Sequence, residues 1–279
     1  MRQGEWKAWW KASARRARGL AAILGLTHLP LCARVELVLA HLVAARRDRT
    51  LSLGIGTVVI SGDDSDTDRR VFEEVFRYDC YPLDCAGRVV VDIGAHKGYF
   101  GAHALLRGAA AVVSFEPESV NFSYLERAAS TFRARGHIWH TRPVAVGDQD
   151  GETTLFTSTR SWAHTIVADR QSESRENAIH LGEPLGTEAV GVVSLETALA
   201  DAAAFGSPLV VKIDAEGSEC AIVLKAAHEI WDPVCQAFVE RHPWAPCDFA
   251  AIAGRLAETG LMPRDEAHDV VRFERAGTA

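Results

Sequence analysis

Three carboxylates follow a short apolar segment in the stretch Leu209-Val-Val-Lys-Ile-Asp-Ala-Glu-Gly-Ser-Glu219. The apolar residues predict a buried strand that delivers Asp214 and Glu216 at its carboxyl end. Lys212 lies inside this strand, and burying its charge is costly unless one of the carboxylates that follow pairs with it. The carboxylates could act as a general base toward a hydroxyl group, hold a cofactor or bind a divalent cation. A helix N-terminal cluster without a ligand is the alternative interpretation.

A second polar group, Glu240-Arg-His-Pro-Trp244, ends the apolar run that starts at Ala237. Parallel strands bring their carboxyl ends to one edge of a sheet, so His242 is expected near Asp214 and Glu216. Because an imidazole titrates near neutral pH, His242 joins these two carboxylates as a candidate catalytic residue. A surface or purely structural histidine is the alternative.

The third motif is a glycine loop, Asp92-Ile-Gly-Ala-His-Lys-Gly98, between the apolar run 89–91 and a helical segment. Gly94 allows the backbone to turn tightly and to approach a ligand closely. Gly98 opens a helix, whose first N–H groups favour an anion. Nicotinamide enzymes prefer G-x-G-x-x-G with a pyrophosphate on the helix. Asp92 would repel a pyrophosphate and suits the ammonium and sulfonium groups of S-adenosylmethionine instead.

Glu116 ends the next apolar run, 24 residues after Asp92. A carboxylate at the end of a second parallel strand can accept hydrogen bonds from both hydroxyls of a ribose. The glycine loop and Glu116 together predict a cofactor that contains adenosine.

Short apolar runs alternate with helical segments from residue 88 onward. Runs that are apolar on both faces indicate strands covered by helices on both sides, which predicts a doubly wound, mostly parallel sheet. The expected strands are 89–91, 111–115, 140–146, 209–213 and 237–240. Upstream, 57–60 predicts a strand, and the spacing of Val71, Phe72, Val75 and Phe76 predicts one face of a helix.

Two segments depart from this alternation. Residues 151–156 follow a Gly-Asp-Gln-Asp-Gly turn and predict the second arm of a hairpin. Residues 157–188 are polar and long for a loop, which favours a substrate lid. His164, in this segment, could face the substrate.

Charge is distributed unevenly along the chain. Residues 1–50 hold 10 Lys and Arg against 3 acidic residues, whereas the rest of the chain holds 20 against 34. The net negative charge of the chain after residue 50 argues against a surface that binds along a phosphate backbone, and no nucleic-acid partner is expected. We interpret 1–50, with an amphipathic helix over 31–47, as a basic helical extension that caps the catalytic domain 51–279. A helix on a membrane surface and a signal peptide are the alternatives.

The six cysteines form no C-x-x-C pair and show no zinc-ligand spacing, so no metal site is assigned. Cys220 and Cys235 lie in apolar runs, where a cysteine acts as a small hydrophobic residue. We therefore expect reduced thiols and a cytoplasmic protein. Frequent Ala and Arg hint at a GC-rich bacterial genome.

Six motifs, in this order, resemble the FkbM family of S-adenosylmethionine-dependent methyltransferases. They are Val91–Phe100, Ser114–Pro117, Ala145–Asp148, Ser194–Leu199, Val211–Glu219 and Phe238–His242. The resemblance covers about residues 70–243. The family often has Asn in place of His96, and its motif before the fourth strand reads Leu-Asp where this chain has Glu196.

The resemblance implies a class I methyltransferase fold, which is Rossmann-like, with a seven-stranded sheet that ends in an antiparallel strand, here 270–274. It implies that Asp92, Gly94 and Gly98 hold the methionine part of S-adenosylmethionine and that Glu116 holds the ribose. The full set of expected cofactor-binding residues is Asp92, Gly94, Ala95, His96, Gly98, Tyr99, Glu116, Pro117, Ala145, Val146 and Asp214.

The reaction that the resemblance implies is O-methylation of a hydroxyl group on a small natural product or a sugar, with S-adenosylhomocysteine as product. N-methylation of a small amine, oxidoreduction with NAD and a non-catalytic binding module are the alternatives. Assembly into a homo-oligomer is left open.

Overall fold

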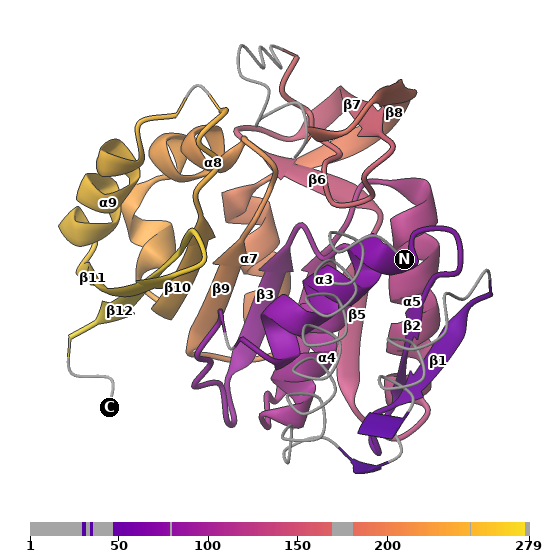
Figure 1. Ribbon diagram of the computed structural model, residues 1–279. Coiled ribbons are helices and arrows are strands. Elements are labelled where there is room, and N and C mark those ends of the chain that lie inside the picture. The colour runs from indigo at the N-terminus through magenta and orange to yellow at the C-terminus, as the bar shows by residue number, and fades with distance from the viewer. Residues whose placement is uncertain are drawn as a thin grey trace, which may run out of the picture.

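A computed structural model of the 279-residue chain describes residues 30–31, 34–35, 47–78, 80–168, 181–245 and 247–276. Its centre is a seven-stranded sheet with the order β11-β12-β10-β9-β3-β4-β5 (Figure 1). The strands are β3 Val89–Ile93, β4 Ala111–Phe115, β5 Ile138–Arg142, β9 Leu209–Ile213, β10 Val234–Glu240, β11 Leu261–Ala267 and β12 Val270–Arg275.

The sheet is doubly wound, as predicted. From β3 the chain passes outward through β4 to β5, and β9 and β10 then follow on the other side of β3. Adjacent strands from β10 to β5 pair in parallel, whereas β12 runs antiparallel to both β10 and β11. The predicted antiparallel last strand is therefore confirmed, and the switch point lies between β3 and β9, where ligands of such sheets bind.

Helices cover both faces of the sheet (Figure 1). One face packs against α3 Ser65–Phe76, α4 Tyr99–Leu106 and α5 Ser119–Arg133, and the other packs against α7 Leu195–Ala203, α8 Glu219–Lys225 and α9 Phe249–Glu258. Val90 of β3 belongs to the first core, while Val89 and Val91 belong to the second. Both faces of each strand are buried, which explains the unbroken apolar runs in the sequence. A 3-10 turn, His228–Trp231, precedes β10.

Ahead of this sheet, β1 Arg49–Ser52 and β2 Thr57–Ile60 form an antiparallel pair. The predicted strand 57–60 is confirmed, and so is the helix with Val71, Phe72, Val75 and Phe76. β1 spans the boundary drawn after residue 50. Most of the extension 1–50, including nearly all of the helix predicted over 31–47, lies outside the described residues.

A second sheet corrects two predictions. It contains β6 Val144–Gly147, β7 Gly151–Ser158 and β8 Pro184–Ser194 in the order β6-β8-β7. The single strand predicted over 140–146 is wrong, because Pro143 separates β5 from β6 and the two strands join different sheets. Proline has no N–H to donate to a ladder and therefore interrupts the pairing.

The strand predicted at 151–156 is confirmed as part of β7, but its pairing in a hairpin with the strand before it is wrong. β7 pairs antiparallel with β8, and β6 pairs parallel with β8. The long strand β8 returns between β6 and β7, so the turn at 147–151 joins two strands that are not neighbours. Such an insertion leaves no local signal in the sequence.

Two cysteines form a disulfide, which overturns the expectation of reduced thiols for them. Cys220 and Cys247 are bonded, with their Cα atoms 5.6 Å apart. Their separation of 27 residues matches no motif, and it is the packing of α8 beside α9 that brings them together. Cys80, Cys85 and Cys235 are buried thiols, and Cys32 lies outside the described residues. None of the helices in the described ranges has the length and apolar character needed to cross a membrane.

Candidate active site

A cavity of about 550 Å³ opens at the carboxyl edge of the sheet. Its volume lies in the range that small-molecule sites occupy. It brings together most of the predicted site residues, which are Gly94, Ala95, His96, Tyr99, Glu116, Pro117, Ala145, Val146, Asp214, Glu216 and His242. The segment after β7, within the predicted lid, supplies Ser161, Trp162, His164, Thr165 and Ile166.

The glycine loop touches the loop that follows β9. Gly94 has φ +73°, and a Cβ built there would lie 1.7 Å from the carbonyl oxygen of Asp214. Its N–H donates to the carbonyl of Phe115 at 3.1 Å. Only glycine fits a backbone approach this close, so Gly94 holds the strand ends that form the floor of the cavity together.

Two predicted cofactor residues do not line the cavity. Gly98, at φ +88°, caps α4 and packs against Leu125 and Trp139. Asp92 is completely buried in β3. The structure therefore gives Gly98 a packing role and places Asp92 behind the cavity wall.

Asp92 belongs to a line of polar side chains across four strands, which we call the polar row. The Trp139 indole N–H donates to Ser114 Oγ at 3.0 Å, and Ser114 Oγ lies 3.3 Å from Asp92 Oδ2. Lys212 Nζ follows, 3.5 Å from Asp92 Oδ1 and 3.1 Å from Asp214 Oδ2. Asp92 stands directly opposite Ser114 and Lys212 in the strand register.

Lys212 is the cation of the polar row. Burial alone would lower its pKa, but Asp214 and Asp92 outweigh that effect and raise the pKa above its ordinary value. Its ammonium group also donates to the carbonyls of Gly94 at 2.8 Å and Ile93 at 3.3 Å. Of the three carboxylates that follow Lys212 in the sequence, Asp214 is therefore the one that pairs with it. Asp92 is a second partner of Lys212.

Glu116 faces the cavity with both carboxyl oxygens fixed. Oε2 accepts from the N–H of His96 at 2.8 Å, and Oε1 accepts from the N–H of Glu118 at 3.0 Å. Burial raises the pKa of Glu116 to about 8. Each oxygen keeps a further lone pair, so the group can accept from two neighbouring hydroxyls, as a ribose presents them.

His96 lines the cavity as a neutral imidazole. Its Nε2 lies 2.8 Å from Ser161 Oγ, and its buried Nδ1 has no hydrogen-bond partner among the described residues. Burial, together with Lys97 nearby, lowers the pKa of His96 well below its ordinary value. A buried ring nitrogen without a partner points to a hydrogen bond with a ligand.

His242 is surrounded by carboxylates. Its Nδ1 lies 3.1 Å from Glu219, and its Nε2 lies 3.5 Å from Glu216 and 3.8 Å from Asp214. Burial alone would lower the pKa of His242, but Glu216 and Glu219 raise it well above 6.5. The side chain is therefore an imidazolium at neutral pH, which argues against a general base and for a cation that holds the carboxylates in place.

We expect the ring protons of His242 to titrate well above pH 6.5 in an NMR experiment on the folded protein. The raised pKa means that the stability His242 contributes is complete below the unfolded-state pKa, roughly 6.5, and is lost as the pH rises through the folded-state pKa. Glu219→Gln should move the titration toward the ordinary value. A titration of His242 at or below its ordinary pKa would contradict the imidazolium assignment.

Several cavity residues were missed by the sequence analysis. Glu74 and Arg70 come from α3, Tyr81 follows α3, and Glu240 ends β10. Tyr81 donates to Glu240 at 3.2 Å. Glu240 stands at the same kind of strand end as Asp214, and that position could have indicated it. Glu74 carries no such signal, because on α3 it looks like an ordinary exposed helix residue.

One group of cavity residues has a spacing suited to a metal ion. Asp214, Glu240 and His242 each place one ligand atom within 4.8 Å of the others. A metal ion bound there would have to displace the proton of His242, beside the ammonium of Lys212. That the site holds no metal therefore stays a prediction.

The order of the sheet, the glycine loop after its first central strand and the acid after the second define the class I fold of S-adenosylmethionine-dependent methyltransferases. The model of the methyltransferase FkbM domain matches residues 92–271. The chain belongs to the FkbM methyltransferase family, as the motifs predicted, and the cofactor of this family is S-adenosylmethionine.

Solved structures with a similar fold include three methyltransferases. An FkbM methyltransferase from Methylobacillus flagellatus KT is 12% identical, with a TM-score of 0.48, over 94% of this chain and 60% of that one. Magnesium protoporphyrin IX methyltransferase from Synechocystis PCC 6803, with bound SAM, is 9% identical (TM-score 0.39) over 77% and 82%. A putative RNA methyltransferase from Pyrococcus horikoshii is 14% identical (TM-score 0.36) over 75% and 85%.

The chain thus spans 60% of the length of the Methylobacillus protein. Comparison with curated proteins found no significant match.

The cavity residues fit this cofactor. Glu116 offers acceptors for the ribose hydroxyls, and Ala145 and Val146 offer an apolar surface for the adenine. Asp214 presents a carboxylate for the ammonium of the methionine part, and the open Nδ1 of His96 offers a further polar contact. When bound, the cofactor supplies an electrophilic methyl group on a sulfonium.

Proposed function

We propose that this chain transfers a methyl group from S-adenosylmethionine to a hydroxyl group of a small molecule, a natural product or a sugar. The observation that carries the proposal is the position of Asp214 and Glu216, which face the same cavity as Glu116 and the glycine loop. Alignment of the two reactants supplies most of the rate, because the sulfonium is already a good leaving group. A carboxylate near the acceptor then removes the hydroxyl proton.

Glu216 is the best candidate for this base. Burial raises its pKa, while His242 lowers it in part. A pKa above the ordinary value brings a carboxylate closer to the pH at which it must accept a proton. Its backbone has φ +47°, an uncommon conformation for a residue with a side chain, and such outliers cluster at functional sites. Asp214, paired with Lys212, is held as a carboxylate that positions its neighbours.

The test is turnover of the two carboxylate variants. Glu216→Gln should lower kcat by roughly 100-fold or more, the usual contribution of a general base, and leave the affinity for S-adenosylhomocysteine unchanged. Asp214→Asn should lower both kcat and the affinity for S-adenosylhomocysteine. If both variants keep full turnover with unchanged affinity, neither carboxylate is the base.

A calorimetric titration separates the methyltransferase from the NAD-dependent alternative. We expect S-adenosylhomocysteine to release heat on binding to the wild type and NAD to give no signal, because the loop has two glycines and lacks the G-x-G-x-x-G pattern that places a pyrophosphate on the helix. Binding of NAD with no response to S-adenosylhomocysteine would contradict the proposal.

A small amine is the second candidate acceptor, and Glu74 favours it. The Glu74 carboxyl lines the cavity, and burial raises its pKa to about 7 although the positive charge of Arg70 partly offsets this. An ammonium group would give the carboxyl a direct ionic partner. Turnover of amines and of their alcohol analogues, measured with the wild type and with Glu74→Gln, distinguishes an amine acceptor from a hydroxyl acceptor.

The remaining expectations belong to the same proposal. Specificity would come from the segment after β7, from α3 and from the N-terminal extension, the parts that lie outside the cofactor motifs. A cytoplasmic location and a capping role for residues 1–50 also remain proposals, and the disulfide is unusual for a reducing compartment.

A further inference from the structure

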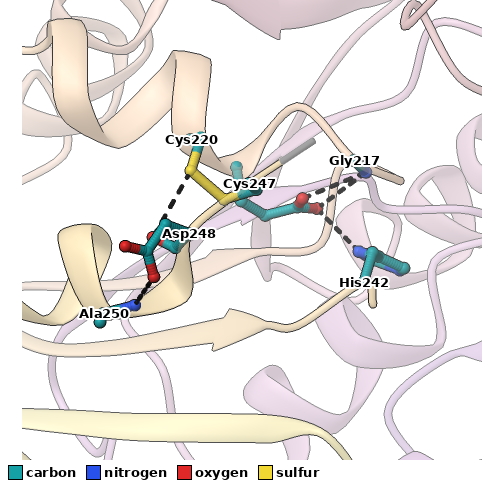
Figure 2. The surroundings of a disulfide bond; sticks show 7 residues. Gly217, Cys220, His242, Cys247, Asp248 and Ala250 are labelled. Carbon is teal, nitrogen blue, oxygen red and sulfur yellow. Dashed lines mark hydrogen bonds and ion pairs between the residues drawn. A yellow bond between two sulfur atoms is a disulfide. The ribbon is translucent and has the colours of Figure 1, made fainter. Parts of the chain in front are cut away.

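A covalent bond closes the loop that forms one wall of the cavity. The disulfide joins Cys220, the second residue of α8, to Cys247, which precedes the N-cap of α9 (Figure 2). We call residues 241–247, between β10 and this cap, the β10–α9 loop. Arg241, His242, Pro243 and Trp244 of this loop line the cavity.

The β10–α9 loop packs on the turn that carries Glu216. A Cβ built at Gly217, which has φ +97°, would lie 2.7 Å from the Trp244 ring and 3.2 Å from the side chain of Ala245. Trp244 and Ala245 therefore rest directly on the backbone of Gly217. Any outward shift of the loop would uncover this turn.

Glu219 links the same two segments by hydrogen bonds. Its carboxylate accepts from the N–H groups of Ala215 at 2.8 Å and Gly217 at 3.1 Å, and it lies 3.1 Å from His242 Nδ1. Cys220 is the next residue in the chain. The ionic link and the covalent link between α8 and the loop therefore stand side by side.

The described residues of the loop, 241–245 and 247, have few other backbone attachments. The N–H of Arg241 donates to the carbonyl of Asp269 at 2.8 Å, while those of Ala245 and Cys247 donate within the loop. Among the described residues, Arg241 is thus the one position where the loop backbone bonds outside itself, and it lies at the start of the loop. At the far end the disulfide provides the fixed point.

We propose that the Cys220–Cys247 disulfide positions this wall, so that its reduction loosens the acceptor side of the cavity and leaves the cofactor side intact. While the bond is closed, His242 stays between Glu216 and Glu219, and Trp244 stays on Gly217. The ribose end of the cofactor side, with Glu116 and the glycine loop, is built on β3 and β4 and has no covalent link to the β10–α9 loop. Asp214, at its methionine end, keeps its ion pair with Lys212 of β9, at 3.1 Å, whether or not the loop moves. That this wall faces the acceptor rests on the proposed function.

The reduction is an ordinary thiol–disulfide exchange. One thiolate of a dithiol attacks a sulfur of the disulfide and releases one cysteine as thiolate. The second thiolate of the dithiol then attacks the mixed disulfide and releases the other cysteine. Two electrons pass to the protein, Cys220 and Cys247 each end with one proton as thiols, and the dithiol closes to a cyclic disulfide.

The test compares three forms of the full chain, which are the oxidised wild type, the wild type reduced with dithiothreitol, and the double variant Cys220→Ser, Cys247→Ser. Acrylamide quenching of Trp244 reports the wall, with Trp244→Phe in each form to isolate its signal from the other tryptophans. NMR titration of His242 reports the carboxylate contacts. Calorimetry with S-adenosylhomocysteine reports the cofactor side, and dithiothreitol added to the double variant controls for other effects of the reductant.

We expect reduction and the double substitution to increase the quenching of Trp244 and to shift the His242 pKa toward its ordinary value, with unchanged affinity for S-adenosylhomocysteine. Reoxidation of the wild type should reverse both changes. The same Trp244 quenching and His242 titration in all three forms would overturn the proposal and leave the disulfide as a staple between α8 and α9. A parallel loss of cofactor affinity would also overturn it, as a general loss of structure.

These outcomes are separate from the proposed function. A protein that binds no S-adenosylhomocysteine in any form would count against the methyltransferase, whereas the Trp244 and His242 signals would still decide the role of the disulfide.

Discussion

Above pH 8, where the carboxyl is ionised, Glu116→Gln is expected to weaken the binding of S-adenosylhomocysteine by about 2–3 kcal/mol, or roughly 30- to 150-fold, the loss of one or two hydrogen bonds to a charged acceptor. The carboxylate accepts from two backbone N–H groups and has lone pairs left for the ribose hydroxyls. An amide in its place turns an NH₂ toward a backbone N–H, which twists the group out of position. Calorimetric titration of the variant measures the effect.

The same carboxyl gives the binding a pH dependence. Because the pKa of Glu116 is raised to about 8, the group in the free protein is largely protonated below that pH and accepts hydrogen bonds poorly. Affinity of the wild type should therefore rise as the pH passes through 8, and Glu116→Gln should lose this rise. Glu152→Gln, at an exposed position of β7, is the matched control. Equal affinities of wild type and Glu116→Gln above pH 8 would exclude Glu116 from the ribose site.

Lys212→Met is expected to lower the free energy of unfolding by about 3–5 kcal/mol, the cost of leaving a buried ionic partner without its counterion. Asp92 is fully buried, and Lys212 is the cation that approaches it in the polar row. The aliphatic replacement keeps the volume of the side chain and removes the charge. Urea unfolding measures the change, with Lys225→Met on the exposed end of α8 as control.

A double variant tests whether the loss of stability comes from the Lys212–Asp92 pair. Lys212→Met combined with Asp92→Asn should recover part of the loss, because the amide carries no charge to desolvate. If Lys212→Met unfolds at the same urea concentration as the wild type, Asp92 is not ionised in the folded protein and the polar row is neutral.

The sequence predicted the parts of the site that lie at the carboxyl ends of strands. Glu116 and Asp214 follow apolar runs directly and His242 lies just beyond one, and parallel strands with right-handed crossovers leave few places for their side chains. The fold class and the sheet with its antiparallel last strand followed from the same alternation of apolar runs and helices.

The rest depends on contacts between distant segments. The role of Asp92 changed because strand register, which the sequence does not show, places Lys212 opposite it. Glu74 was missed because the direction of α3 decides which of its faces meets the cavity. The disulfide and the insertion of β8 between β6 and β7 arise from packing of segments far apart in the chain, and neither leaves a local pattern.

The polar row also has a consequence for how this sequence can change over evolutionary time. Trp139, Ser114, Asp92 and Lys212 come from four different strands, and each buried side chain is hydrogen-bonded or ion-paired to the next. Because a substitution at one position leaves its neighbour without that partner, we expect single changes to be selected against, although only Lys212 of the four lines the cavity. Among descendants of this chain we expect these positions to be inherited as a block and, where they do change, to be replaced together by residues without charge.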